Sequence, residues 1–501
     1  MIHRQQFAIL KKRIDLPGYK SIDMEDGWVL SYHEDLPVYL DKKSQTFLLG
    51  YAWQVLPERG TPEEELKKLA EAGNDHISES ELLNCEESWN GRYVVISGGR
   101  VYLDANGMLN VFFSDAGLSS DCLLLARVMG YEEKIYTPGT MNWMPGMLTH
   151  YEGIRHLMPS QIYDYRNRAV YARELLPGTF IQGKSEEDLT DQFIECFCHS
   201  LKQMEMIFPD QRLMVALTGG YDSRTLAALA KKAGTDFMAY TMEFDTIEEG
   251  DVEIPPKICE TLGIGHVYVE RDRSNYSKER EEEYIRYICG LVRDEDRLYY
   301  AYDQFRDLTK TCGRCVLLRS GIWPNLAYKY SRFFDNNRPA DELYQEYHID
   351  AGSLEWDSLH EYFTWCEEHP EKRLDLANRF YHEVRSGCWL AYIEQGFTML
   401  DDVISLEPVN SRVLLSILAA FSEESRLGKR HQTLITGKAC PQLSGIPYGN
   451  SINRKGSFAS LRSKARRASD RLRQMGFRNA VQLYVKIIRE HYRIWILKRK
   501  H

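Results

Sequence analysis

The sequence predicts a mixed α/β protein with a sheet-rich N-terminal part, a central part in which strands alternate with helices, and a helical C-terminal part. Up to about residue 170, short apolar runs such as 46–49 and 93–96 are separated by Gly, Asn and Asp turns. From Glu186 onward, helical periods alternate with brief apolar runs, a pattern typical of a mostly parallel, covered sheet. These runs are 213–217, 237–240, 266–269 and 316–318. Beyond about residue 340 the strand signals fade and helical periods dominate.

Turn signals indicate where the N-terminal part ends. The letters Asp-Ala-Asn-Gly at 104–107 lie between two apolar runs and are typical of a hairpin turn. Pro-Gly pairs at 138 and 145 follow, and the helical pattern begins soon after them. We therefore expect a boundary between residues 170 and 190, with domains over 1–180 and 181–458 and a tail over 459–501.

Composition limits the classes of function. The chain has 501 residues, of which 43% are hydrophobic and 27% charged, so we expect several folded domains rather than a disordered protein. The formal charge of −10 argues against a nucleic-acid binder, because affinity for phosphate requires basic surface. The segment 454–501 is strongly basic, in contrast to the rest of the chain.

The start of the chain and its cysteines predict a cytoplasmic location. The first residues lack the apolar core of a secretory signal, and no apolar run approaches the length of a membrane span. The eleven cysteines are scattered, which fits reduced thiols better than a disulfide framework.

The clearest candidate site is a loop between a predicted strand and a predicted helix. The strand 213–217 is followed by Thr218, Gly219, Gly220, Tyr221, Asp222 and Ser223, and the helix 224–233 comes next. Paired glycines and a helix N-terminus favour bound phosphate, and Thr218 and Ser223 add hydroxyl donors. Asp222 fits a phosphate site only if a cation bridges it to the phosphates, so it predicts Mg²⁺. The alternative is a Gly-Gly turn capped by Asp and Ser.

This loop is neither a Walker A loop nor a dinucleotide-binding loop, because no Lys-Ser/Thr or third glycine follows. It resembles the S-G-G-x-D-S PP-loop of ATP pyrophosphatases, in the form found in asparagine synthetase-like proteins, with Thr218 in place of the leading serine. The resemblance continues through 237–242 and through 251–263 with His266. It implies bound ATP, with the adenine near Leu217 and Tyr240.

Further segments extend the resemblance and also depart from it. The residues at 317–321 are similar to the strand and the Ser320-Gly321 turn that close over the nucleotide. The family continues with an acidic stretch, whereas this chain reads Ile-Trp-Pro-Asn-Leu-Ala at 322–327. Glu407 begins a stretch similar in position to the family's Glu-x-Arg-x-Pro motif. Lys455 stands where the family places an active-site lysine, which would act with Asp222; alternatively, Lys455 only begins the basic tail.

The N-terminal part resembles a class II glutamine amidotransferase domain, on the residues at 91–93, 104–107 and 149–155. The resemblance implies an Ntn-like αββα domain, followed by a PP-loop synthetase domain of the adenine nucleotide alpha hydrolase-like fold. Glutamine-hydrolysing members carry a cysteine nucleophile at position two, where this chain has Ile2. Glutaminase activity should therefore be absent, and ammonia or an amine should supply the nitrogen.

The function that these features predict is ATP-dependent amide formation. ATP and a small-molecule carboxylate would give an acyl-adenylate and pyrophosphate, and a nitrogen nucleophile would then form the amide, as in asparagine, surface-glycan or peptide biosynthesis. One rival is a non-catalytic nucleotide-binding scaffold. A second is an RNA-modifying PP-loop enzyme that uses the Cys312-x-x-Cys315 pair and the basic tail. The tail itself reads as a basic amphipathic helix that packs on the acidic body, rests weakly on a membrane surface or binds RNA.

Overall fold

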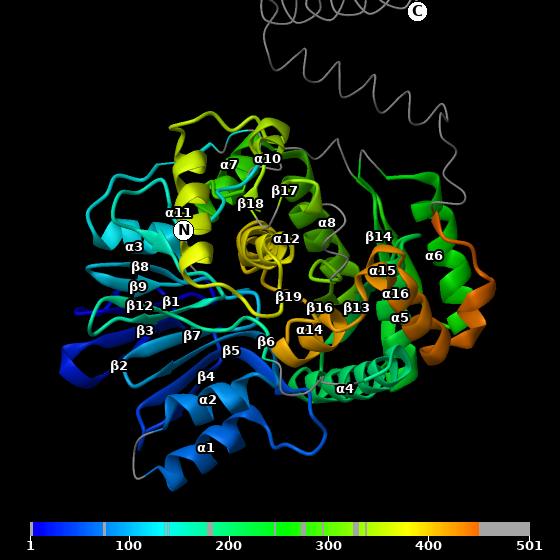
Figure 1. The fold of residues 1–501 in the computed structure, drawn as a ribbon, viewed down its shortest axis with the longest axis horizontal. Coiled ribbons are helices and arrows are strands. Elements are labelled where there is room, and N and C mark those ends of the chain that lie inside the picture. The colour runs from blue at the N-terminus through cyan, green and yellow to red at the C-terminus, as the bar shows by residue number, and fades with distance from the viewer. Residues whose placement is uncertain are drawn as a thin grey trace, which may run out of the picture.

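The chain folds into two halves, one built on antiparallel sheets and one on a parallel sheet (Figure 1). The computed structural model describes residues 4–449 except 74–76, 135, 138, 140, 178–183, 245–246, 272–276, 293–294, 324–329 and 336–337. Ile2, Lys455 and the tail 459–501 lie outside these residues. Within them, no helix is long and apolar enough to cross a membrane.

Two antiparallel sheets form the N-terminal half. The first has the order β10-β8-β9-β1-β3-β2 and the second the order β12-β11-β7-β6-β5-β4. The strands of the first are β1 (Phe7–Leu10), β2 (Tyr19–Asp23), β3 (Val29–His33), β8 (Phe112–Ser114), β9 (Gly117–Ser119) and β10 (Arg155–His156). Those of the second are β4 (Val38–Asp41), β5 (Thr46–Gln54), β6 (Trp89–Ser97), β7 (Arg100–Leu103), β11 (Gln161–Asp164) and β12 (Ala169–Ala172).

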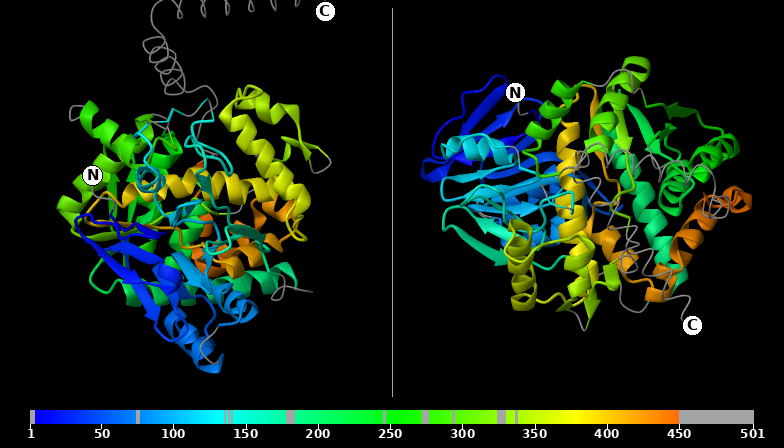
Figure 2. Two further views of the ribbon diagram at one scale, coloured as in Figure 1. Left: turned by 90° about the vertical axis from the view of Figure 1, so that its left-hand side faces the viewer. Right: turned by 90° about the horizontal axis from the view of Figure 1, so that it is seen from above.

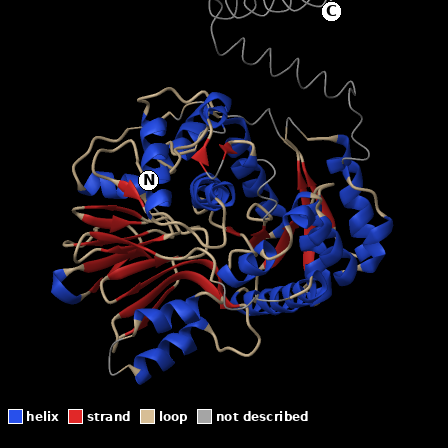
Figure 3. Cartoon of the chain, viewed as in Figure 1, coloured by secondary structure: helices blue, strands red, loops and turns tan. Residues whose placement is uncertain are grey.

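The two sheets pack face to face, with helices on their outer faces (Figure 3). Alternate residues of the strands, such as Ile9, Leu30, Leu49 and Val94, meet in one apolar core between the sheets. On the other face of the second sheet, Leu48 and Val95 pack under α1 (Pro62–Ala72) and α2 (Glu79–Glu86). The outer face of the first sheet packs on α3 (Cys122–Val128) and on helices of the second half. The half is therefore layered helix, sheet, sheet, helix.

A five-stranded parallel sheet forms the centre of the second half. Its order is β15-β14-β13-β16-β19, and every neighbouring pair is parallel. The strands are β13 (Arg212–Ala216), β14 (Phe237–Met242), β15 (His266–Val269), β16 (Cys315–Leu318) and β19 (Val403–Leu406). The first four coincide with the predicted apolar runs. The fifth strand, β19, lies in the part of the chain where the strand signals fade, and it forms by pairing with β16.

Helices cover both faces of the parallel sheet, because its strands carry apolar side chains on both faces. Leu213 and Val215 face one core and Met214 faces the other. The first core is closed by α4 (Glu186–Ile207), α5 (Tyr221–Ala233), α6 (Glu249–Leu262), α14 (Arg412–Ala419) and α16 (Arg430–Ala439). The second is closed by α7 (Lys278–Tyr287), α8 (Glu295–Cys312), α11 (Leu354–Glu368), α12 (Leu376–Phe380) and α13 (Ala391–Phe397). The remaining elements are α10 (Asp341–Glu346), α15 (Glu423–Leu427), the hairpin β17 (Phe334–Asp335) and β18 (Arg338–Pro339), and 3-10 turns at Glu25–Gly27 and Pro441–Gly445.

One long helical segment lies between the two halves. It runs from α12 through π-helical turns at Tyr381–Leu390 into α13, and Figure 2 shows it between the N-terminal sheets and the parallel sheet. Asn110 of the N-terminal half donates to the carbonyl of Ala391 on this segment, at 3.1 Å. Single π-helical turns within a helix often mark functional sites. Here they begin beside the loops described next.

Candidate functional site

The order of the parallel strands predicts where a ligand binds. From β13 the chain proceeds outward to β14 and β15, and then returns to the other side of β13 as β16. Neighbouring loops therefore diverge at the carboxyl ends of β13 and β16, which leaves a crevice there in sheets of this kind. The predicted loop 218–223 follows β13, and the predicted Ser320-Gly321 turn follows β16. The fold thus brings these two candidate segments to the same end of the sheet, where the carboxyl ends of β13 and β16 lie.

Two hydroxyl groups hold the loop after β13 in shape. The Thr218 N–H donates to Ser223 Oγ at 3.0 Å, and the two hydroxyl oxygens are 3.1 Å apart. The Gly220 N–H donates to Thr218 Oγ1 at 3.1 Å, and α5 begins at the next residue. Threonine in the leading position therefore supplies a hydroxyl to the loop, as serine would.

Gly219 is the more closely confined of the two glycines in the loop. A Cβ atom built on it would lie 2.6 Å from the carbonyl oxygen of Gly250 and 3.1 Å from the Cα of Gly449. Its N–H donates to Asp251 Oδ1 at 2.9 Å. A carboxylate oxygen therefore occupies one N–H donor of the loop.

Asp222 lies in the first turn of α5 and faces the start of α16. The side-chain amide of Gln432 donates to Asp222 Oδ1. Lys429 precedes Gln432 by one helical turn, with a left-handed φ of 60°. Burial lowers the pKa of Lys429, and the charge of Asp222 opposes that shift. Its ammonium has no ion pair within the part of the chain that the structure describes. Sequence reasoning missed both α16 residues, because their proximity to Asp222 depends on the packing of α16 on α5.

The last described residues lie across the loop. The rings of Tyr448 and Tyr221 stack at 3.8 Å, and the Arg224 guanidinium lies 3.9 Å from the Tyr448 ring centre. Arg224 also donates to the carbonyls of Ile446 and Pro447, at 2.8 and 2.6 Å. The Gly449 N–H donates to the carbonyl of Gly219 at 2.9 Å. The segment 446–449 therefore covers one side of the loop.

Buried charges surround the turn after β16. Arg319 forms an ion pair with Glu394 of α13 at 2.7 Å. Glu407, directly after β19, accepts hydrogen bonds from the N–H groups of Gly321 at 2.8 Å and Ile322 at 3.3 Å. A Cβ on Gly321 would lie 2.8 Å from Glu407 Oε1, so the close approach requires glycine. Ser320 lies partly exposed between them.

The Glu407 carboxyl group is poised to exchange a proton near neutral pH. Its side chain is 4% exposed, and burial together with the charge of Glu394 raises its pKa to about 8, against the opposing charge of Arg319. Glu407 Oε1 and Glu394 Oε2 have no hydrogen-bond partner among the described residues. A buried carboxyl group with an open lone pair, at the end of the sheet where ligands are expected, is a candidate acid or base.

Tyr381 connects the two loops. Its hydroxyl donates to the carbonyl of Gly321 at 3.1 Å. Burial raises its pKa, and the charges of Asp222 and Glu407 add to the shift. The ring therefore lies within electrostatic reach of both carboxyl groups, at the first of the π-helical turns.

Leu217 and Tyr240 lie at the ends of β13 and β14 but are buried. The Leu217 N–H donates to the Tyr240 carbonyl at 2.8 Å, and their side chains belong to different cores on opposite faces of the sheet. The Tyr240 ring packs edge-on against Phe305 at 5.3 Å. At these two positions the strand-end backbone, rather than the side chains, is what a ligand at this end of the sheet would meet.

Cys312 and Cys315 lie at the amino ends of the parallel strands, opposite the end of the sheet that carries the loops. Cys312 ends α8 and Cys315 begins β16, and burial raises the pKa of Cys315 to about 12. Among the described residues, no three His, Cys, Asp or Glu side chains are grouped to hold a metal ion. All eleven cysteines are free thiols.

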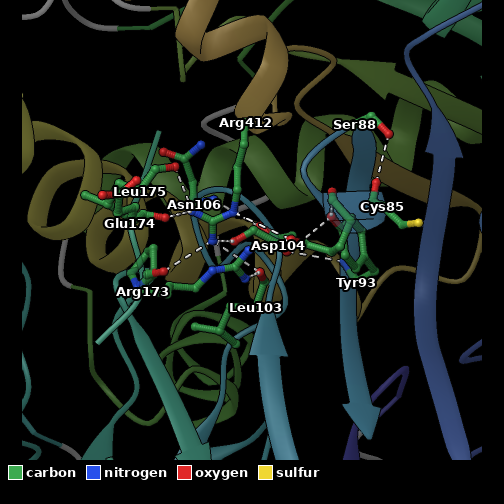
Figure 4. Close-up of polar contacts among 12 residues, drawn as sticks. Cys85, Ser88, Tyr93, Leu103, Asp104, Asn106, Arg173, Glu174, Leu175 and Arg412 are labelled. Atoms are coloured by element: carbon green, nitrogen blue, oxygen red, sulfur yellow. Dashed lines mark hydrogen bonds and ion pairs between the residues drawn. The ribbon is translucent and has the colours of Figure 1, made fainter. Parts of the chain in front are cut away.

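The N-terminal residues that carried the amidotransferase resemblance form part of the contact between the halves (Figure 4). The Asp104 carboxylate accepts from the N–H groups of Tyr93 and Met108, at 3.2 and 2.9 Å, and from the Asn410 amide at 2.8 Å. Arg412, at the start of α14, donates to carbonyls of the N-terminal half, including that of Leu175 at 2.8 Å. The Asp104 carboxylate and the Arg412 guanidinium therefore already have hydrogen-bond partners within the protein.

Solved structures that are similar to parts of this chain include two synthetases. NMN synthetase from Francisella tularensis matches over 50% of this chain and 96% of its own, with 15% sequence identity and a TM-score of 0.20. A glutamine-dependent NAD+ synthetase from Acinetobacter baumannii, solved in complex with ADP, matches over 32% of this chain and 30% of its own, with 13% identity and a TM-score of 0.19. The match spans less than a third of that synthetase. No protein-family model matches the sequence, and no curated protein matches it at a significant level.

Proposed function

We propose that this chain is an asparagine synthetase-like, ATP-dependent ligase that activates a carboxylate as its adenylate and joins it to nitrogen in an amide bond. The observation that carries the proposal is the position of the loop 218–223. It follows the central strand of a parallel sheet, at the edge where the strand order reverses, and it opens α5. Ligands bind in this crevice, and the free N–H groups of a helix start favour phosphate.

In this proposal ATP lies across the carboxyl edge of the sheet. The adenosine would lie against the strand-end backbone of Leu217 and Tyr240 and the Ser320-Gly321 turn. The phosphates would meet the loop residues Thr218, Gly219, Gly220 and Ser223, and would replace the hydrogen bonds that the N–H groups of the first three make within the protein. Mg²⁺ fits a single carboxylate such as Asp222, because it is commonly held by one or two carboxylates together with phosphate oxygens and water. When bound, the ion would offset phosphate charge as pyrophosphate leaves.

Two lysines are candidates for stabilising the pyrophosphate. Lys429 shares a helix face with Gln432, which touches Asp222, so its ammonium can reach the phosphate side of the loop. Lys455 follows Gly449 by only a few residues, and Gly449 is hydrogen-bonded to the loop. A fixed cation at the leaving group stabilises charge that grows in the transition state.

Glu407 is the candidate base for the second step. An ammonium or amine must lose a proton to attack the acyl-adenylate, and a base with a pKa near the working pH accepts it most efficiently. Glu407 has such a pKa and lies behind the turn that would close over the adenylate. Burial of this region would also limit hydrolysis of the intermediate by water.

The nitrogen in this proposal comes from ammonia or from an amine on a second substrate. The N-terminal half is proposed to be an Ntn-like domain that has lost its nucleophile, since Ile2 carries no thiol. Its Asp104 carboxylate is filled by internal hydrogen bonds, which supports a structural role.

Pyrophosphate exchange tests the proposal directly. The full chain would be incubated with ATP, labelled pyrophosphate, Mg²⁺ and a panel of small carboxylates, including aspartate, sugar carboxylates and peptide side chains. Label entering ATP only when one carboxylate is present is the expected result. Binding of ATP without exchange for any carboxylate would overturn the ligase.

A nucleotide-binding scaffold is the second candidate. The observation in its favour is that Asp251 and the segment 446–449 already contact the loop. The scaffold predicts ATP binding with no release of AMP under any condition. The RNA-modifying alternative has no such support, because the Cys312 and Cys315 pair lies at the opposite edge of the sheet.

A further inference from the structure

The long helical segment between the two halves leaves one line of side chains partly exposed. Within its π-helical turns at Tyr381–Leu390, seven residues are buried, and the other three are Tyr381, Arg385 and Trp389. These three are spaced four residues apart, which the wide π-helical turn brings onto one face. The Tyr381 hydroxyl donates to the carbonyl of Gly321 at 3.1 Å, so this face begins at the turn after β16.

Arg385 lies over an aromatic ring of the same face. Its guanidinium carbon is 3.2 Å from the centre of the Trp389 ring. At this distance the guanidinium must lie flat on the ring, because an edge-on group would bring its nitrogen atoms too close to the ring carbons. The ring then covers one face of the cation, and the N–H groups point outward in the plane of the guanidinium. This geometry suits a two-point contact with a carboxylate.

Aromatic rings from other elements border the same face. The ring centre of Trp143, in the N-terminal half, is 5.5 Å from the Arg385 guanidinium. Trp143 packs edge-on against Tyr347, with ring centres 5.8 Å apart. At the other end of the face, the Tyr330 ring packs edge-on against Tyr381, also at 5.8 Å. Arg385 is therefore placed between apolar rings, where a charged contact is stronger than in water.

Trp143 keeps a hydrogen-bond donor without a partner. Its side chain is 6% exposed, and its Nε1 atom has no hydrogen-bond partner among the described residues. An indole N–H only donates, and a buried donor that stays unpaired is costly to stability. The backbone here is fixed, because the N–H of Met144 donates to the carbonyl of Leu291 at 2.8 Å. The indole thus offers a second donor close to Arg385.

We propose that Arg385 holds the carboxylate of an amino acid that supplies the nitrogen for amide formation. The rings of Trp143, Trp389 and Tyr381 would pack around this amino acid. The inference rests on the proposed function, and it narrows the nitrogen donor from ammonia or any amine to an amine that carries a carboxylate. Residues one helical turn apart lie about 6 Å from each other, so an amino acid bound at Arg385 directs its amine toward Tyr381 and Gly321.

The bond-forming step balances with the groups already described. The ammonium of the bound amino acid gives one proton to Glu407, and its nitrogen attacks the acyl carbon of the adenylate. The C–N bond forms, the C–O bond to the phosphate breaks, and AMP leaves with the electron pair. The amide nitrogen then loses its second proton to solvent. The product is an N-acyl amino acid, and Arg385 holds its free carboxylate throughout.

Calorimetric titration of the full chain tests the site without requiring turnover. Each protein amino acid is titrated, and each is compared with its α-amide, which has the same side chain and amine but no carboxylate. The expected result is that at least one amino acid binds, and that its α-amide binds at least about tenfold more weakly. Absence of binding by every amino acid, or equal binding by the amide, would overturn the inference.

Variants at Arg385 sharpen the same measurement. R385K keeps the charge but loses the planar two-point contact, so affinity for the amino acid should fall about tenfold, and in R385M about 100-fold. R332M is the matched control, because Arg332 also lies over a ring, that of Phe333 at 4.6 Å, but pairs with Glu346 at the surface. Its affinity should equal that of the unmodified protein. Circular dichroism establishes folding, and R385K carries the test if R385M does not fold. Unchanged affinity in the Arg385 variants, or an equal loss in R332M, contradicts the assignment.

Product analysis separates this inference from the proposed function. With ATP and the carboxylate that supports pyrophosphate exchange, mass spectrometry should detect the N-acyl product of the amino acid that binds. Exchange with an amide formed from ammonia alone would overturn this inference and leave the ligase standing. Binding of an amino acid through Arg385 in a protein that exchanges pyrophosphate with no carboxylate would support the site and overturn the ligase.

Discussion

Two buried polar regions of this protein differ in how completely the oxygens of their carboxyl groups are paired. At the contact between the halves, Asp104 accepts backbone and amide hydrogen bonds on both oxygens. At the carboxyl edge of the parallel sheet, Glu407 and Glu394 each keep one oxygen without a partner among the described residues. Both regions exclude water, so an unpaired oxygen in the second is costly to stability.

The two regions also differ in the direction in which their surroundings shift the pKa of a buried carboxyl group. Glu86 is buried like Glu407, but Arg173 and Arg412 outweigh the effect of burial and lower its pKa. One arginine, Arg319, faces two carboxyl groups at the sheet edge, and the pKa of Glu407 rises. The difference fits a first region that maintains the fold and, under the proposed function, a second region that retains groups for chemistry. Each prediction below tests one side of this comparison.

The largest expected effect is on stability. Arg173→Met leaves Glu86 buried beside only the more distant Arg412, and should lower the free energy of unfolding by about 3 to 5 kcal/mol. Urea denaturation measures it. Arg13→Met removes the exposed pair with Asp23 and should change stability by less than about 1 kcal/mol. Equal effects of the two variants would contradict the structural role of the Glu86 network.

The next effect is on the first chemical step. Asp222→Asn removes the negative charge but keeps an acceptor for Gln432, so pyrophosphate exchange should fall about 100- to 1,000-fold. Stability should change by less than about 1 kcal/mol, because the hydrogen bond remains. Exchange within a factor of two of the unmodified protein would exclude Asp222 from the site.

Glu407→Gln separates the two steps. Amide formation should fall about 100-fold, because the base is lost, while pyrophosphate exchange remains within about tenfold. In the unmodified protein kcat/KM for amide formation should rise with pH up to about 8 as Glu407 loses its proton. The glutamine variant should lack that rise of kcat/KM with pH. An identical pH profile in both proteins would assign the base elsewhere.

The same substitution should change how stability depends on pH. The folded-state pKa of Glu407 is raised, so the unfolded chain releases this proton at lower pH than the folded protein. Stability contributed by the neutral carboxyl group is therefore complete at about pH 4 and is lost as pH rises toward 8. The difference in unfolding free energy between Glu407→Gln and the unmodified protein should grow by roughly 2 kcal/mol from pH 6 to 8. A constant difference would show that Glu407 is ionised throughout.

The smallest effect concerns Lys429. Lys429→Met keeps most of the buried length of the side chain but removes its charge, and should weaken the apparent affinity for pyrophosphate in the exchange assay about tenfold. Lys438→Met is the control, because that lysine lies later on the same helix and pairs with Asp191. Matching losses in both variants would indicate a general charge effect.

Local patterns revealed much of the fold and the centre of the site. The runs at β13, β14, β15 and β16 alternate with helices, so the parallel sheet and the loop 218–223 follow from local sequence. The fifth strand, β19, is only four residues long and owes its conformation to pairing with β16. Lys429 and Glu394 give no local signal, because Lys429 approaches the site only when α16 packs on α5, and Glu394 only when α13 packs on the sheet.

The contact between the halves has a consequence for biosynthesis. Asn90 donates to the carbonyl of Pro408, and Asp104 accepts from Asn410, so these groups wait for more than 300 residues of chain to be made. Pairing across such separations slows folding. The N-terminal half leaves the ribosome with Asn90 and Asp104 unable to complete their hydrogen bonds and with Glu86 lacking the charge of Arg412, and it reaches its final form only after α14 has emerged. A fragment ending near residue 180 would keep that unfinished surface permanently.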